Sequence, residues 1–133
     1  MDELVTLIIP VLNREDTLPR LFASLRRVTY EPLEVIFVDN GSTDRSVALC
    51  SEYGGTLLHC QQRGAAAARN VGLRAAHGTY VSFFDSDDEM SPTFIADLVA
   101  LLRDGAELAV ARTRSVFASG REMVRAVGGH SVA

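Results

Sequence analysis

The sequence predicts an α/β fold: a doubly wound, mainly parallel sheet with helices on both faces. Short β-branched apolar runs alternate with segments of helical periodicity, and only short connections separate them. The runs are almost continuously apolar, which is typical of strands buried on both faces of a parallel sheet. Strand–helix–strand units of this kind are right-handed. We expect the sheet to be truncated after about five strands.

The expected strands and helices alternate along the chain. Strands are expected over residues 5–10, 33–38, 56–60, 80–84 and 108–111. Leucine and phenylalanine at positions 18, 21, 22 and 25 have helical spacing, with Asp16 or Thr17 as the N-cap and Pro19 in the first turn. Further helices are expected over 46–53, over 64–76, where four alanines are consecutive, and from Pro92 onward. A last helix is predicted over 121–127.

Length and composition indicate one globular domain. The 133 residues are 47% hydrophobic and 23% charged, and we expect a core over about residues 4–112 and a poorly defined tail over 113–133. Seventeen acidic and thirteen basic residues give a net charge of −4, which argues against a nucleic-acid partner. All basic residues are arginines, so a P-loop is excluded and a receiver-type phosphoacceptor domain is disfavoured. No G-x-G-x-x-G follows the first expected strand, which disfavours a dinucleotide-binding enzyme.

The sequence gives no sign of export or of a transmembrane segment. Its acidic first residues run directly into a strand pattern, and no apolar run approaches the roughly 20 residues that span a bilayer. Cys50 and Cys60 are expected to be free buried thiols. We therefore expect a cytoplasmic protein, with peripheral attachment to the inner face of a membrane as an alternative.

Polar clusters follow the first, second and fourth expected strands, at residues 10–15, 39–44 and 85–89. Taken singly, each could be a helix cap or an ordinary turn. However, the carboxyl ends of parallel strands meet at one edge of a sheet, where ligands bind at a switch in strand order. The recurrence at three strand ends therefore favours a shared ligand site.

The cluster at 85–89 is the most informative, because four of its five residues carry carboxylates that repel one another. One or two carboxylates would be enough to stabilise the N-terminus of a helix. A divalent cation would remove the repulsion, and clustered oxygen ligands suit Mg²⁺ or Mn²⁺ better than zinc.

A second candidate contact, with phosphate, lies at residues 63–70. Gly64 would let the backbone approach a ligand at a helix start, and Arg63 and Arg69 could hold a phosphate in a bidentate manner. Alternatively, Arg69 and Arg74 only solvate a helix face. The three histidines, at positions 59, 77 and 130, form no constellation and are expected to be structural or exposed.

Four segments in this order resemble family 2 glycosyltransferases, which are inverting enzymes of the GT-A fold. They are residues 9–15 (IPVLNRE), 38–44 (VDNGSTD), 64–72 (GAAAARNVG) and 84–88 (FDSDD), and the resemblance covers about residues 4–112. It implies a nucleoside-diphosphate-sugar donor, with a UDP-sugar first among the candidates, and a glycan or lipid acceptor. It also implies a place in polysaccharide or cell-envelope glycan synthesis.

The resemblance further implies roles for individual residues. Pro10, Val11, Asn13 and Glu15 would line the nucleotide pocket, Asp39 and Asn40 would contact the base, and Arg63 and Arg69 would approach the phosphates or ribose. The stretch Asp85-Ser86-Asp87 is similar to the D-x-D motif, with Asp87 or Asp88 holding Mg²⁺ or Mn²⁺ beneath the diphosphate. Which of the carboxylates binds metal and which binds ribose stays open.

The catalytic base of the family is an aspartate well beyond the D-x-D motif, and here it is expected beyond Ala133. The alternative functions are a non-catalytic module that binds a nucleotide or nucleotide-sugar, and a truncated remnant. Apolar surface near residues 108–116 would favour self-association.

Overall fold

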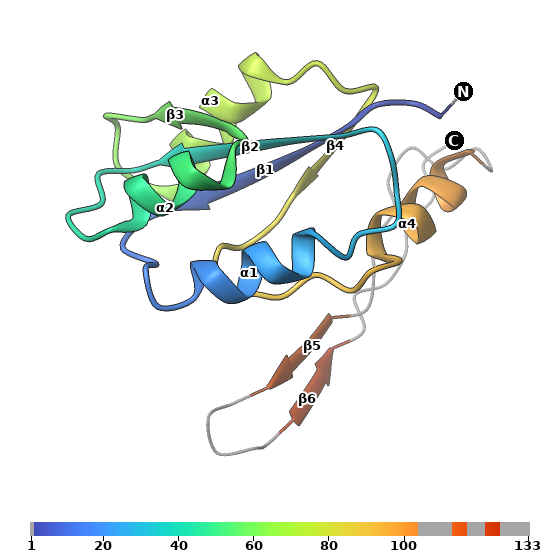
Figure 1. Ribbon diagram of the computed structural model, residues 1–133. Coiled ribbons are helices and arrows are strands. Elements are labelled where there is room, and N and C mark those ends of the chain that lie inside the picture. Colours follow the sequence, from blue (N-terminus) through green and yellow to red (C-terminus); the bar gives the residue numbers. More distant parts are fainter. Residues whose placement is uncertain (1, 104–112, 117–121, 126–133) are drawn as a thin grey trace. The chain divides into compact units, whose positions relative to one another are not determined.

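The computed structural model describes residues 2–103, 113–116 and 122–125. Two compact units divide the chain, the first over Met1–Pro92 and the second over Thr93–Ala133. The first unit contains four strands in one sheet together with the three helices that connect them (Figure 1). Its elements are β1 (Val5–Val11), α1 (Leu18–Leu25), β2 (Leu33–Asp39), α2 (Ser46–Tyr53), β3 (Thr56–His59), α3 (Ala65–Ala75) and β4 (Tyr80–Phe83).

The sheet is parallel throughout, in the order β3-β2-β1-β4. β1 lies in the interior of the sheet, where it pairs with β2 on one side and β4 on the other. Its side chains are buried almost without interruption, which explains why this strand has an uninterrupted apolar sequence. The predicted doubly wound α/β class is therefore confirmed.

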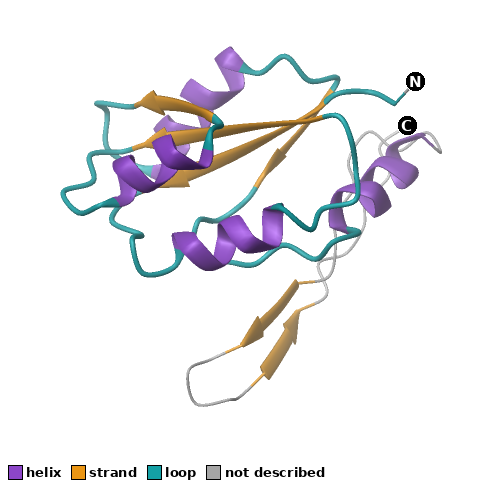
Figure 2. Cartoon of the chain, viewed as in Figure 1, coloured by secondary structure: helices purple, strands orange, loops and turns teal. Residues whose placement is uncertain are grey.

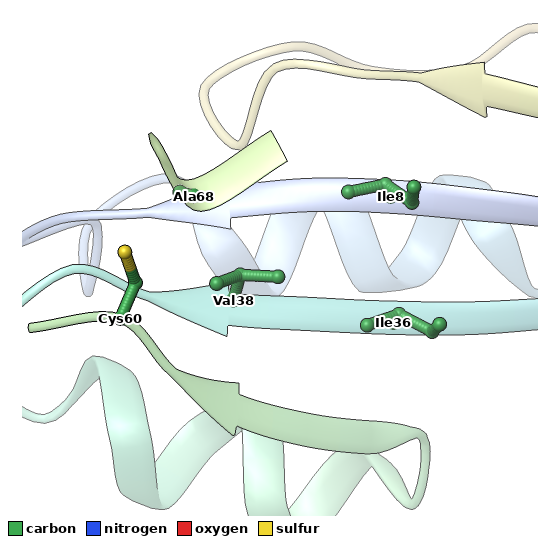
Figure 3. Packing of buried hydrophobic residues seen from close by; sticks show 5 residues of the cluster. All are labelled: Ile8, Ile36, Val38, Cys60 and Ala68. Atoms are coloured by element: carbon green, nitrogen blue, oxygen red, sulfur yellow. The ribbon is translucent and has the colours of Figure 1, made fainter. Parts of the chain in front are cut away.

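Helices cover both faces of the sheet (Figure 2). On one face, Phe22 of α1, Phe37 of β2 and Tyr53 of α2 pack ring against ring, with centroids 4.9–5.6 Å apart. On the other face, Ala68 of α3 belongs to an apolar cluster with Ile8, Ile36, Val38 and Cys60, five residues shown in Figure 3. Each large aliphatic side chain that is fully buried contributes about 1.5–3 kcal/mol. Both cysteines are free and buried, as expected.

Gly72 fixes how closely α3 approaches the sheet. A Cβ atom at this position would lie 2.5 Å from Cγ2 of Ile8 and 3.2 Å from Cγ2 of Val38. Only a residue without a side chain allows this spacing, so the glycine in the sequence GAAAARNVG serves packing between α3, β1 and β2.

The second unit contains α4 (Phe94–Arg103) and an antiparallel pair, β5 (Thr113–Val116) with β6 (Glu122–Arg125). The helix predicted over 121–127 is wrong where the structure describes it, because residues 122–125 are strand. The local helix propensity of arginine, glutamate and methionine is overridden by pairing with β5, which a window on residues 121–127 alone does not reveal. The strand predicted over 108–111 lies outside the described residues.

Most other predicted bounds agree with the structure to within about two residues. Among the described helices, none has both the length and the apolar character needed to cross a membrane. The expectation of a single domain stays a prediction.

Candidate functional site

The direction in which the chain extends the sheet reverses at β1. β2 and β3 lie on one side of it and β4 lies on the other, so the carboxyl ends of β1, β2 and β4 meet at a topological switch point. The loops that follow these three strands contain the polar clusters found in the sequence. The fold thus brings the predicted site residues to one edge, which we call the carboxyl edge of the sheet.

The loop after β1 is bonded to the loop after β2. Asn13, whose φ of 51° lies in the left-handed region, accepts a hydrogen bond at Oδ1 from the N–H of Thr43 at 2.8 Å. Its own N–H donates to Oγ of Ser42 at 3.0 Å. The N–H of Glu15 donates to Asp44 at 3.1 Å. Asn13 and Glu15, both predicted to line a nucleotide pocket, therefore also hold two loops together.

Further bonds strengthen this junction. The buried Ser46 hydroxyl at the start of α2 accepts the N–H of Arg14 at 2.8 Å. Asp44 Oδ1 accepts the N–H of Ser46 at 2.9 Å, and hydrogen bonding from Ser46 lowers the pKa of Asp44. The carboxylate of Glu15 accepts the N–H of Arg45 at 3.3 Å. The junction holds the backbone at the carboxyl edge in a defined geometry.

Asp39 ends β2 and is only 5% exposed. Its carboxylate accepts the N–H groups of Gly41 and Ser42 at 3.2–3.3 Å, which forms the turn after the strand. Nδ1 of His59, at the end of β3, lies 3.7 Å from Oδ2 of Asp39. Burial and then the charge of Asp39 raise the pKa of Cys50 to about 12, so this thiol stays protonated.

Asn40 connects β2 to the loop between β3 and α3. Its amide donates to the carbonyls of Cys60 at 3.2 Å and Gln62 at 2.8 Å, and its Oδ1 accepts the N–H of Gly64 at 2.9 Å. Gly64 has a φ of 114° and directly precedes α3, so the amide fixes the conformation at which this helix begins. The predicted contact of Asn40 with a base stays untested, while its role in the loop is defined by these bonds.

The acidic loop after β4 presents three carboxylates close to one another. Oxygen atoms of Asp85, Asp87 and Asp88 all lie within 4.8 Å of one another, and all three residues are exposed. Partial burial raises the pKa of Asp88, and the charges of Asp87 and Asp85 raise it further against the opposite effect of Arg20. This set of hard oxygen donors fits Mg²⁺ or Mn²⁺.

Residues of the β1–α1 segment hold the acidic loop. The Thr17 hydroxyl donates to the carbonyl of the buried Ser86 at 3.0 Å. A guanidinium nitrogen of Arg14 lies 3.9 Å from Oδ2 of Asp87. Thr17 is the N-cap residue of α1, as predicted, but its side chain makes no capping bond. The hydroxyl instead contacts the acidic loop.

The remaining predicted residues differ in what they offer to a ligand. Val11 is only 1% exposed, so its side chain belongs to the core, while Pro10 is half-buried. Arg63 is exposed just before α3, and Arg69 is half-buried within it. Within residues 2–103, neither guanidinium forms an ion pair. In the part of the chain that the structure describes, neither arginine therefore has an acidic partner.

Sequence reasoning set His59 aside, named Thr17 only as a helix cap, and included Arg14 in the cluster at 10–15 without a role of its own. His59 is the last residue of β3, as Asp39 is of β2, and its position at the end of an apolar run was the available signal. The contact of Thr17 with Ser86 joins residues 69 positions apart, and no local pattern predicts it.

Comparison with known proteins defines the class to which this arrangement belongs. The sequence profile of glycosyl transferase family 2 matches residues 6–129, and the chain belongs to this family. It is 38% identical over 111 residues to the uncharacterized glycosyltransferase YibD of Escherichia coli strain K12. This match covers 79% of the present chain and 32% of YibD. The chain thus spans about a third of the length of this relative.

Solved structures agree with the family and with the GT-A fold. S. aureus TarS 1-349 in complex with UDP is 28% identical, with a TM-score of 0.69 over 76% of the chain and 32% of TarS 1-349. The glucosyl-3-phosphoglycerate synthase of Mycobacterium tuberculosis, solved with Mn²⁺, UDP and phosphoglyceric acid, is 27% identical, with a TM-score of 0.68. That match covers 78% of this chain and 41% of the synthase chain. The family resemblance predicted from the four sequence segments is confirmed.

Proposed function

We propose that this chain forms the donor-binding half of an inverting glycosyltransferase that uses a nucleoside-diphosphate-sugar and a divalent cation, Mg²⁺ or Mn²⁺. The observation that carries the proposal is the group of three aspartates, Asp85, Asp87 and Asp88, at the carboxyl edge of a family 2 sheet. The Mn²⁺ and UDP in the mycobacterial relative, and UDP in TarS, support the same ligand class here.

In the proposed complex, Asp87 and Asp88 hold the cation, and Asp85 holds either the cation or the ribose. A cation bound there supplies Lewis-acid stabilisation of the negative charge that develops on the departing diphosphate. Arg14, 3.9 Å from Asp87, restrains the orientation of that carboxylate. Arg63 and Arg69, which lack internal acidic partners among the described residues, contact the donor's phosphates or ribose.

The nucleobase is proposed to lie against Asp39, beside the junction of the β1–α1 and β2–α2 loops. Pro10, Asn13 and Glu15 contribute to this side of the site. Because the side chain of Val11 is buried, Val11 contributes through its backbone. The bonds between Asn13, Glu15 and the second loop keep this surface in shape before the ligand arrives, which lowers the entropic cost of binding.

In the transfer step, an acceptor hydroxyl oxygen forms a bond to the anomeric carbon. The bond between that carbon and the diphosphate oxygen breaks, and its electron pair leaves with the nucleoside diphosphate, so the configuration at the carbon inverts. The proton of the hydroxyl passes to a general base. Between Asp88 and Arg103, Glu89 pairs with Arg20 and Asp97 accepts a hydrogen bond from Thr93. We therefore place the base beyond Arg103 in the sequence.

A second candidate function is a non-catalytic module that binds a nucleotide or nucleotide-sugar. The engagement of Glu89 and Asp97 with other side chains favours this module, because neither residue is then available as a catalytic base. The two candidates differ in a direct assay. Release of nucleoside diphosphate from a nucleotide-sugar in the presence of Mn²⁺ favours the enzyme, while tight binding without release or transfer favours the module.

The proposal is tested by thermal unfolding of this chain with UDP, GDP, CDP or ADP, each with and without Mn²⁺. A ligand at 100 times its Kd adds about 2.7 kcal/mol of stability, which raises Tm by several degrees. We expect a shift that requires the metal and that disappears in Asp87→Asn. Glu52→Gln, an exposed carboxylate change on α2, serves as the charge control and should keep the shift. If a folded sample shows no shift with any of the four nucleotides, the proposal is wrong.

A further inference from the structure

We propose that His59 reads the donor's nucleobase together with Asp39, and that the pair selects bases with a ring N–H beside a carbonyl, as in uracil and guanine. The inference rests on the proposed function and goes beyond it, since it adds a specificity-determining residue and a preferred class of base. It is carried by the position of the two side chains, by their exposure, and by the hydrogen-bonding capacity that the fold leaves unused.

The position follows from strand register. Val11 of β1 is in register with Asp39 of β2, and Asp39 is in register with His59 of β3. Neighbours in register on parallel strands project from the same face, so these three residues form one row at the carboxyl edge. Val11 and Asp39 are buried, whereas the His59 side chain is 63% exposed. The row therefore opens to solvent at β3, where a ligand can reach it.

The Asp39 carboxylate has capacity for another donor. A carboxylate offers about four lone-pair sites, and here it accepts the N–H groups of Gly41 and Ser42 at 3.2–3.3 Å. A separation of 3.7 Å between Nδ1 of His59 and Oδ2 of Asp39 is longer than a hydrogen bond. The ring nitrogen is thus close to the carboxylate without being bonded to it. The two groups form an acceptor beside a donor.

This pattern matches one class of base edge. Uracil and guanine present a ring N–H, which the Asp39 carboxylate accepts, beside a carbonyl oxygen, to which a His59 N–H donates. Cytosine and adenine present the reverse pattern, an unprotonated ring nitrogen beside an amino group. The ring nitrogen of these bases would place its lone pair against the carboxylate, and the amino group would face the histidine donor. Both contacts are unfavourable, so the pair discriminates against these bases.

The test compares the Kd values of UDP, GDP, CDP and ADP, each with Mn²⁺, for the unaltered chain and three variants. His59→Phe keeps a ring but removes the donor, and His59→Gln keeps a donor without the ring. His77→Phe is the matched control, because His77 bonds Glu34 at the opposite end of the sheet. Thermal unfolding without ligand confirms that each variant is folded before its affinities are compared.

We expect the unaltered chain to bind UDP, GDP or both at least about tenfold more tightly than CDP and ADP. His59→Phe should weaken binding of the preferred nucleotide about tenfold and change the others by about twofold or less. His59→Gln should retain a large part of the preference, and His77→Phe should retain all of it.

Different failures have different meanings. If no nucleotide binds the unaltered chain with Mn²⁺, the proposed function itself is wrong. If nucleotides bind but His59→Phe weakens all four equally, or weakens none, the function stands and the role of His59 is overturned. An equal loss in His59→Phe and His59→Gln also overturns it, since the donor group would then be irrelevant.

Discussion

Two groups of polar side chains at opposite ends of the same sheet differ in how their carboxylates are stabilised. At the amino end, Glu34 of β2 accepts the Thr6 hydroxyl at 2.7 Å and the N–H of His77 at 3.0 Å, and its second oxygen lies 2.8 Å from Nδ1 of His77. Burial alone would raise the pKa of Glu34, but the hydrogen bonds from Thr6 and His77 together lower it below its ordinary 4.5. The hydrogen bonds from Thr6 and His77 thus stabilise the Glu34 carboxylate as an anion without an external ligand.

At the carboxyl edge, the fold brings carboxylates together instead. Partial burial and the charges of Asp87 and Asp85 raise the pKa of Asp88 above its ordinary 3.8. Arg14 lies 3.9 Å from Asp87, and Arg20 pairs with Glu89, so positive charge lies close, but it offsets the rise in the Asp88 pKa only in part. The comparison indicates how a structural carboxylate differs from one that serves a ligand. The first is stabilised as an anion by the chain itself, and for the second we propose an external cation.

The largest effect is expected from breaking the amino-end group. Glu34→Ala removes the acceptor of the fully buried Thr6 hydroxyl and of the His77 N–H. Loss of hydrogen bonds to a charged group should lower the free energy of unfolding by about 2–3 kcal/mol, measured by urea denaturation. Nucleotide affinity should be unchanged. The control Glu52→Ala, on the surface of α2, should stay within about 0.5 kcal/mol, and an equal loss there would contradict the structural role of Glu34.

A smaller effect tests whether a carboxyl-edge residue is also structural. Asn40→Ala removes the three hydrogen bonds to Cys60, Gln62 and Gly64. We expect a loss of about 1–2 kcal/mol of stability, together with weaker nucleotide binding because the start of α3 is released. The control is Ser51→Ala, an exposed polar residue on α2 that lies outside the candidate site segments. If Asn40→Ala changes affinity without changing stability, Asn40 contacts the ligand directly and the positioning role is incorrect.

The smallest effect concerns pH, and the two groups should respond with opposite sign. The folded pKa of Glu34 is lowered, so its stabilising contribution is present above about 4.5 and is lost as the pH falls further. The folded pKa of Asp88 is raised above 3.8. Stability therefore falls as the pH rises from 3.8 through the folded pKa, and the full cost of ionising Asp88 in the folded chain is present above it. Asp88→Asn should therefore stabilise the metal-free chain at pH 7 by less than about 1 kcal/mol, and the gain should vanish below pH 3.8.

Urea denaturation over a series of pH values, in the presence of a chelator, measures this difference. A loss of stability in Asp88→Asn at neutral pH would show that the acidic loop needs this carboxylate for folding. In that case the repulsion between the three aspartates would not distinguish the loop from the Glu34 group.

Much of the fold was predictable from the sequence, because apolar runs and helical spacing are local signals. The bounds of α2 agree with the prediction, and the convergence of three polar loops follows from the parallel topology alone. The β6 strand was missed because its partner β5 lies outside the window that gave the helix prediction. Local propensity therefore failed where pairing with another segment decides the structure.

The sequence predicted which residues gather at the site, but it did not predict the hydrogen bonds between them. The aspartates after β4 were expected to gather, and they do. The bonds of Asn40 to the β3–α3 loop and of Thr17 to the Ser86 carbonyl depend on segments more than 20 positions away. His59 was set aside because a single histidine has no motif, and only strand register places it beside Asp39.

The most direct test of the difference between the two groups is Mn²⁺ binding, followed by electron paramagnetic resonance of the free ion in the presence of UDP. We predict that the unaltered chain and Glu34→Ala remove about one equivalent of Mn²⁺ from solution, and that Asp87→Asn does not. Equal binding by the unaltered chain and Asp87→Asn, or no binding by the unaltered chain, would contradict the assignment of the acidic loop as the metal site.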